Sequence, residues 1–237
     1  MILYTNSMET TSQWLQSVAK GEVPVNLMID FETFGNNPDT CGIMSFALTE
    51  FDELDDSLRP RYELLMAVSM ESNYEMGLDM ASSQKWWNKA ERTAAWSWYV
   101  EMDKVTLQFA QQQLCDLFSM LNEKNVDYRL WSRGDFDIRI LRRLLKGMDV
   151  DIPYYVVRDA RTFIRSLHMD ESLCVRNVDM LHSPMEDCMH CISCIQRANT
   201  TLRKLNFYED EMIVGVTDLE NSSRMKKIRE GGDGYGK

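Results

Sequence analysis

The sequence lacks the features of several protein classes. It has no run of 18 apolar residues, the length that a transmembrane helix needs, and its N-terminal segment lacks the basic start and apolar core of a secretory signal. It also lacks a basic excess, since 26 lysines and arginines against 37 acidic residues give a formal net charge of −11. That balance argues against a protein that coats duplex nucleic acid through a broad basic face, but it allows an enzyme that grips a short single strand. We therefore expect a cytoplasmic protein without a membrane partner.

Internal repeats and a convincing second domain are absent as well. A chain of 237 residues, 44% of them hydrophobic, suits one large α/β domain. The six cysteines, in a chain of this size without an export signal, are expected to be reduced thiols rather than disulfides. We predict a main domain over residues 26–206, with an N-terminal extension over residues 1–25 and a Gly-rich C-terminal tail over residues 207–237.

The stretch HSPMED has the pattern of a helix entry. Ser183 is a suitable N-cap, Pro184 falls at the first helical position, and Glu186 completes a capping box with Ser183. His182 then lies in the preceding loop and Asp187 in the first turns of the helix. From these places the imidazole and the carboxylate can lean toward one point, where they could move a proton and hold a metal. Alone, the pattern also fits two ordinary surface residues at a well-capped helix.

A second stretch, NLMIDFETF over residues 26–34, indicates a strand interrupted by two acids. Side chains alternate along a strand, so Asp30 and Glu32 share one face while Leu27, Ile29 and Phe31 take the other. Two carboxylates on one side of an apolar strand are costly unless a cation lies between them, and a divalent metal would supply that charge. The alternative is an edge strand with a solvated face.

A third acidic position follows the strand predicted over Tyr128–Ser132. The chain turns there into a helix predicted over Ile138–Met148, so Asp135 and Asp137 lie where a strand ends and a helix begins. In open α/β sheets that junction is where ligands bind. Either acid could instead cap the helix.

The remaining elements follow from hydrophobic periodicity and turn residues. We predict further strands over Ile43–Phe51, Tyr62–Met70 and Pro153–Val157, and further helices over Lys104–Asn125, from Arg158 to about Leu167, and from Ser183 to about Leu205.

The adjacent Trp86 and Trp87 cannot both face one core from a helix. We expect one of them near the surface or in a groove, where it could stack on a nucleobase. Packing under a loop is the alternative.

Three cysteines after the helix entry, Cys188, Cys191 and Cys194, have the spacing C-x-x-C-x-x-C, which is also found in zinc sites. On a helix, however, the three thiols would fan over roughly 120° of the surface, so they do not converge on one ion. We expect Cys191 and Cys194 to pack toward the core, and zinc binding stays open as the alternative.

In order along the chain, these motifs resemble the DEDDh group of ribonuclease H-like 3′–5′ exonucleases. The likeness is greatest to exonuclease A of T-even phages and to the mycobacterial-type 3′–5′ exoribonucleases, and it covers about Asn26 to Leu205. It includes Phe136-Asp137, the tryptophan pair and the stretch VRD at residues 157–159. One departure is Asp135, a second acid that could compete with Asp137 for the motif position.

The resemblance implies a ribonuclease H-like mixed central sheet flanked by helices. It also implies that four carboxylates hold two Mg²⁺ or Mn²⁺ ions at the scissile phosphate, with His182 as the general base for the attacking water. The implied metal ligands are Asp30, Glu32, Asp137 and Asp187. The implied reaction is hydrolysis from the 3′ end of single-stranded nucleic acid with release of nucleoside 5′-monophosphates.

The substrate and the assembly are less constrained. The phage likeness favours single-stranded DNA and, for a phage-encoded chain, the host cytoplasm. An exoribonuclease of the same mechanism and a catalytically idle module that binds nucleic acid or protein are the alternatives. The oligomeric state is open, with a dimer among the possibilities.

Overall fold

The computed structural model describes residues 13, 14, 18, 24–54, 62–80, 87, 89 and 92–204. The chain divides into two compact units, Met1–Arg197 and Ala198–Lys237. In the second unit the described residues, 198–204, are helical. Most of the predicted N-terminal extension and the whole predicted tail lie outside the described residues, so the predicted domain boundaries stay a prediction.

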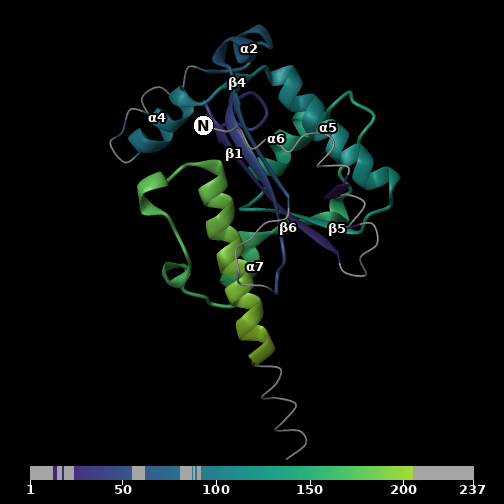
Figure 1. The fold of residues 1–237 in the computed structure, drawn as a ribbon, viewed down its shortest axis with the longest axis vertical. Coiled ribbons are helices and arrows are strands. Elements are labelled where there is room, and N and C mark those ends of the chain that lie inside the picture. The colour runs from purple at the N-terminus through teal and green to yellow at the C-terminus, as the bar shows by residue number, and fades with distance from the viewer. Residues whose placement is uncertain are drawn as a thin grey trace, which may run out of the picture. The chain divides into compact units, whose positions relative to one another are not determined.

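The first unit contains a sheet of six strands in the order β4-β3-β2-β1-β5-β6 among its described residues (Figure 1). The strands are β1 Val25–Thr33, β2 Ile43–Phe51, β3 Glu63–Val68, β4 Lys104–Val105, β5 Tyr128–Ser132 and β6 Val157–Asp159. β2 runs antiparallel to both β1 and β3, whereas β1, β5 and β6 run parallel to one another. The carboxyl ends of β1, β5 and β6 therefore meet at one edge of the sheet. The predicted mixed central sheet with flanking helices is confirmed.

Helices cover both faces of this sheet. They are α2 Met70–Glu75, α4 Thr93–Glu101, α5 Leu107–Glu123, α6 Phe136–Leu145, α7 Ala160–Ser166, and a helix that begins at residue 184 and continues to the end of the first unit. Short 3₁₀ turns lie at Tyr154–Val156 (η2), Glu171–Leu173 (η3) and Val178–Met180 (η4). Within the described part of the chain, no helix is both long and apolar enough to cross a membrane.

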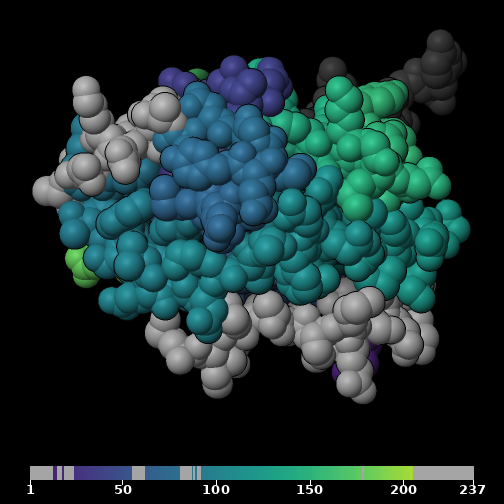
Figure 2. Space-filling view, turned by 90° about the horizontal axis from the view of Figure 1, so that it is seen from above, coloured from purple at the N-terminus to yellow at the C-terminus, as the bar shows by residue number. Residues whose placement is uncertain are grey.

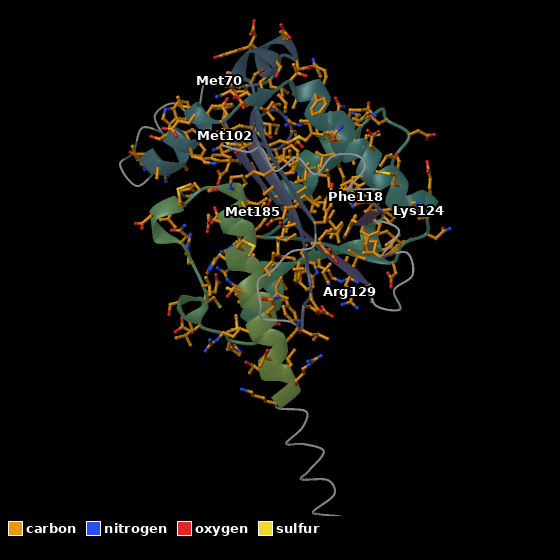
Figure 3. The ribbon with its side chains drawn as sticks, in the orientation of Figure 1. Met70, Met102, Phe118, Lys124, Arg129 and Met185 are labelled. Atoms are coloured by element: carbon orange, nitrogen blue, oxygen red, sulfur yellow. The ribbon has the colours of Figure 1, made fainter. Side chains whose placement is uncertain are left out.

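One sheet face packs against α5 and α6. Leu27, Ile29 and Phe31 of β1 point into this core, where they meet the apolar side of α5, including Phe118 (Figure 3). α5 begins after β4, because Thr106 caps it by accepting a hydrogen bond at Oγ1 from the backbone N–H of Phe109, at 3.2 Å. The helix predicted over Lys104–Asn125 is confirmed over Leu107–Glu123; Lys104–Val105 form β4 instead, and the helix ends two residues earlier than predicted.

The opposite face packs against α7 and the helix that begins at residue 184. Met28 of β1, Ala47 of β2 and Trp131 of β5 form this second core with Ile192 and Ile195. Figure 3 shows Met185 on that helix, beside the sheet, and Thr49 Oγ1 lies 3.4 Å from its sulfur. β1 thus sends its odd-numbered and even-numbered residues to different cores, as the alternation predicted.

Two described residues before β1 also enter the core. Trp14 stacks on Tyr62 with ring centroids 4.5 Å apart, and its Nε1 donates to Glu50 Oε2 at 2.7 Å. Val18 lies in the same core. These contacts tie part of the predicted extension to the main sheet.

α2, which the hydrophobic pattern did not predict, links the sheet to α5. Ser72 Oγ accepts a hydrogen bond from the backbone N–H of Leu107 at 2.9 Å, and Figure 2, which looks down from above, shows α2 beside α5. The buried Asn73 accepts from the Ile43 N–H at 2.7 Å and donates to the Ile43 carbonyl at 2.8 Å. One amide side chain therefore satisfies both backbone groups of the first residue of β2.

The strand predicted over Pro153–Val157 is wrong in its first part. Residues Tyr154–Val156 form a 3₁₀ turn, and pairing with β5 starts at Val157. The fixed φ of Pro153, −58°, suits the start of such a turn, and both tyrosine side chains that follow are exposed.

Candidate active site

β1 delivers two acids to the sheet face that carries the helix from residue 184. Asp30 and Glu32 share the side of the strand on which Met28 packs, opposite Phe31. Between Glu32 and Thr33 the register with β2 shifts, which marks a β-bulge or irregularity. Bulges bend a strand and redirect its side chains, and they are common beside active sites.

α6 brings a third acid to the same point. Asp137 lies in the first turn of α6 with 6% of its surface exposed, and its Oδ1 accepts a hydrogen bond from the backbone N–H of Phe31 at 3.0 Å. Asp135, two residues earlier, is exposed and makes no capping hydrogen bond with its side chain. The structure therefore separates the two acids of this turn, and only Asp137 faces β1.

The helix entry supplies the fourth acid and the histidine. The helix starts at residue 184, and the Asp187 N–H donates to the Ser183 carbonyl at 2.9 Å, which places Ser183 at the predicted N-cap position. His182 precedes it with φ of 65°, in the left-handed region that non-glycine residues rarely adopt. Its Nδ1 lies 3.9 Å from Glu32 Oε1. Ligand atoms of Glu32, His182 and Asp187 all lie within 4.8 Å of one another.

The four carboxylates repel one another. Burial is the largest cause that raises the pKa of Asp30, Glu32, Asp137 and Asp187 above the ordinary value, and the pKa of Asp137 reaches about 6. In every pair of the four, one carboxylate raises the pKa of the other. All four side chains therefore share one electrostatic site, although they come from three separate elements.

Positive groups around the site only partly offset this repulsion. Arg133, Arg92 and Arg161 lower the pKa values of Asp30, Glu32 and Asp137, respectively, but burial outweighs each of them. His182 and Arg176 act in the same way on Asp187, and Arg176 Nη2 lies 3.9 Å from Asp187 Oδ1. A group of buried hard oxygen donors with excess negative charge is the donor set that divalent cations such as Mg²⁺ and Mn²⁺ prefer.

The two tryptophans have different outcomes. Trp86 lies outside the described residues. Trp87 has 2% of its surface exposed, and its Nε1 donates to the Thr33 carbonyl at 3.1 Å. Its ring meets the imidazole of His182 edge to face, with ring centroids 6.4 Å apart. Because its ring is enclosed, we assign Trp87 to the support of His182 and not to the stacking of a base.

No pattern in the sequence indicated that arginines lie at the site. Arg133 directly follows β5, and its Nη2 forms an ion pair with Glu171 Oε2 at 2.6 Å. Arg176 lies in an irregular segment between η3 and η4. Neither belongs to a periodic pattern or a short motif, so only the tertiary structure brings them to the acids.

Residues 25–198 match the family model described as the 3′-5′ exoribonuclease Rv2179c-like domain. A search of curated proteins gave no match. The match to the family model confirms the predicted likeness to the mycobacterial-type exoribonucleases at the level of the family.

Solved structures to which the chain is similar include two of exonuclease I and one of Pop2p. An exonuclease I in complex with the inhibitor BCBP is 14% identical with a TM-score of 0.47, over 79% of this chain and 44% of that chain. E. coli exonuclease I in complex with a 5cy-dT13 oligonucleotide is 12% identical with a TM-score of 0.41, over 79% and 42%. S. pombe Pop2p in its Mg²⁺ and Mn²⁺ bound form is 10% identical with a TM-score of 0.42, over 87% and 92%. The chain thus spans less than half the length of the exonuclease I chains that it matches.

Proposed function

The chain belongs to the 3′-5′ exoribonuclease Rv2179c-like domain family, and from this membership we propose that it is a metal-dependent 3′–5′ exonuclease. It would hydrolyse the last phosphodiester bond of a single strand and release a nucleoside 5′-monophosphate. One observation carries the proposal: four mutually repelling carboxylates from β1, α6 and the helix from residue 184 converge beside a histidine. A fold that tolerates this electrostatic cost gains from it only when cations bind there.

The acids have the chemistry of a two-metal site. Asp30, Glu32, Asp137 and Asp187 would hold two Mg²⁺ or Mn²⁺ ions through their carboxylate oxygens. When bound, such ions acidify a water and neutralise the charge of the scissile phosphate and leaving oxygen. Asp137 is already oriented for this role, because the Phe31 N–H holds its Oδ1 at 3.0 Å.

His182 would act as the general base. It lies at the rim of the acid cluster, with 32% of its side chain exposed, so a water on the substrate side can reach its ring. An imidazole can take a proton at neutral pH, and the neighbouring Glu32 and Asp187 stabilise the imidazolium that results. The contact with Trp87 limits the motion of the ring on its inner side.

The substrate is proposed to be single-stranded RNA. The family description names exoribonuclease activity, which moves the preference from DNA, favoured by the sequence alone, to RNA. Discrimination between the two depends on contacts to the 2′-hydroxyl. DNA remains the second substrate to be tested.

The proposal is tested with RNA and DNA oligonucleotides of one sequence that carry a label at the 5′ or the 3′ end. With Mn²⁺, the 5′-labelled RNA should shorten stepwise, and the 3′-labelled RNA should release labelled mononucleotide 5′-phosphate at once. Asp187→Asn should remove this activity, whereas the matched control Asp135→Asn, an exposed acid beside the site, should keep it. Binding of the strand without shortening in any metal would instead favour the idle binding module.

A further inference from the structure

A second group of metal-binding side chains lies further along the helix that carries Asp187. Ligand atoms of Glu171, His190 and Cys194 all lie within 4.8 Å of one another. His190 and Cys194 come from the helix, and Glu171 comes from η3. None of them belongs to the acid cluster of the proposed active site.

His190 is oriented as a metal ligand. Its Nδ1 lies 3.0 Å from the carbonyl oxygen of Val175, and a carbonyl can only accept, so Nδ1 carries the proton. In the neutral ring Nε2 is then the unprotonated nitrogen, and it points at Cys194 Sγ from 3.9 Å. Metal-binding histidines usually donate their other ring N–H to a carbonyl or carboxylate, which fixes the ring and raises its basicity.

The spacing also fits. His190 and Cys194 are four residues apart on one helix, so their side chains lie on one face. With Zn–N near 2.1 Å and Zn–S near 2.3 Å, the two ligand atoms of a tetrahedral site lie about 3.6 Å apart. The observed 3.9 Å is close to that separation. His190 has 3% and Cys194 0% of its surface exposed, so an ion between them would be shielded from water on the helix side.

We propose that Glu171, His190 and Cys194 form a zinc site. One thiolate, one imidazole and one carboxylate supply three of the four ligands of a tetrahedral zinc ion. The ion pair with Arg133 uses Oε2 of Glu171, which leaves the other carboxylate oxygen for the metal. The Cys194 thiolate and the Glu171 carboxylate carry two negative charges, which Zn²⁺ balances.

The site would fasten η3 to the helix. η3 buries none of its side chains, and Leu173 at its end and Val175 after it are 58% and 61% exposed, so apolar packing does little to hold this segment. Its described attachments to the helix are polar, such as the bond from the Val175 N–H to Ser193 Oγ at 3.0 Å. A metal that bridges the segment and the helix would supply the missing stability. The same segment leads on to His182.

This set differs from the zinc site that the cysteine spacing suggested. Cys188 is enclosed in the core, with its thiol 3.8 Å from the carbonyl oxygens of both Met28 and Ala47. Cys191 faces the Arg133 guanidinium. The three thiols thus have different surroundings, as the helical geometry predicted, and only Cys194 meets other metal ligands.

Cobalt(II) is the probe that separates this site from the acid cluster. Metal-free protein titrated with Co²⁺ should develop thiolate-to-cobalt charge-transfer bands and the strong visible bands of tetrahedral cobalt, saturating at about one ion per chain. The oxygen ligands of the acid cluster cannot give thiolate bands. Added Zn²⁺ should abolish the bands, and protein purified without chelator should contain about one zinc per chain.

Variants of the ligands test the assignment. Cys194→Ser should lose the charge-transfer bands, because it removes the one thiolate of the site. Cys115→Ser, in α5, is the control and should bind cobalt like the wild type. Circular dichroism confirms that each variant is folded. Absence of thiolate bands in the folded wild-type protein, or their survival in folded Cys194→Ser, would overturn the proposal; if Cys194→Ser does not fold, an unchanged cobalt spectrum in His190→Gln would do so.

Discussion

Replacing Asp137 by asparagine should stabilise the metal-free protein while it destroys the proposed active site. The asparagine side chain has the same shape as the aspartate, and its Oδ1 could still accept from the Phe31 N–H, but it would carry no charge. Burial raises the pKa of Asp137 from 3.8 to about 6, which corresponds to about 3 kcal/mol of destabilisation when the carboxylate is ionised. The wild-type site provides no hydrogen-bond acceptor meant for the NH₂ group of the asparagine, which lowers the gain. We therefore expect the free energy of unfolding to rise by about 1–3 kcal/mol at pH 8.

The pH dependence of the gain tests its cause. An acid whose pKa is higher in the folded than in the unfolded protein contributes stability below the unfolded pKa and loses it as the pH rises through the folded pKa. The window for Asp137 therefore runs from about 4, its unfolded value, to about 6. The difference in stability between the variant and the wild type should be small below this window and complete above it.

The assay is urea unfolding with a chelator present, at a pH near 4 and at pH 8, for the wild type, Asp137→Asn and Asp135→Asn. The last variant removes an exposed charge two residues away and should change the free energy of unfolding little at either pH. Addition of Mn²⁺ should stabilise the wild type more than Asp137→Asn, because the variant has lost one ligand. If Asp137→Asn were no more stable than the wild type at pH 8 without metal, the claimed cost of burying the Asp137 carboxylate would be wrong.

Three further predictions concern the same site. The affinity for Mn²⁺, measured by calorimetry, should rise as the pH increases through about 6. The reason is that the raised pKa values require protons to leave Asp137 and its neighbours before the metal binds. An affinity independent of pH from about 5 to 8 would contradict this. His182→Ala should lower kcat by about 10²- to 10⁴-fold with little change in Mn²⁺ affinity, whereas an equal loss of affinity would identify His182 as a metal ligand beside Glu32 and Asp187. Trp87→Phe removes the hydrogen bond to the Thr33 carbonyl and should lower the free energy of unfolding, measured by thermal unfolding, by about 1 kcal/mol. It should also lower kcat several-fold with unchanged KM. An unchanged kcat would refute the proposal that Trp87 supports His182.

The sequence predicted the parts of the fold that local rules determine. The predicted bounds of β2 and β5 match the structure, because turn residues flank both apolar runs. The alternation in β1 predicted that Asp30 and Glu32 share one face, and the two cores on either side of the sheet separate Met28 from Phe31 accordingly. Such features depend only on the period of two in a strand.

The sequence did not predict α2, because a tertiary contact holds this helix in place. α2 has no strong apolar period, and the buried Asn73 anchors it through hydrogen bonds to Ile43, 30 residues earlier. Neither helical propensity nor hydrophobicity contains information about such a partner.

The convergence of the acids was predictable only as a set. The hydrogen bond between Phe31 and Asp137 joins residues 106 apart in the sequence, and no local rule selects Asp137 over the nearby Asp135. The family motif does select it, because the motif records which acids meet in space. The structure gives the physical reason: the parallel pairing of β1 with β5 places the first turn of α6 beside β1, and that turn directs Asp137 inward and Asp135 to solvent.

The backbone conformation of His182 could not be predicted from the motif or from the capping pattern. The capping box predicted that His182 lies outside the helix, but not that its φ is 65°. A non-glycine residue in this region costs roughly 1 kcal/mol or more relative to ordinary backbone, so the surrounding contacts must compensate for it. Glycine would adopt this conformation without strain, and the chain has histidine there instead. The imidazole lies between Trp87 and Glu32, and these two contacts are the compensation that the structure shows for the conformational cost.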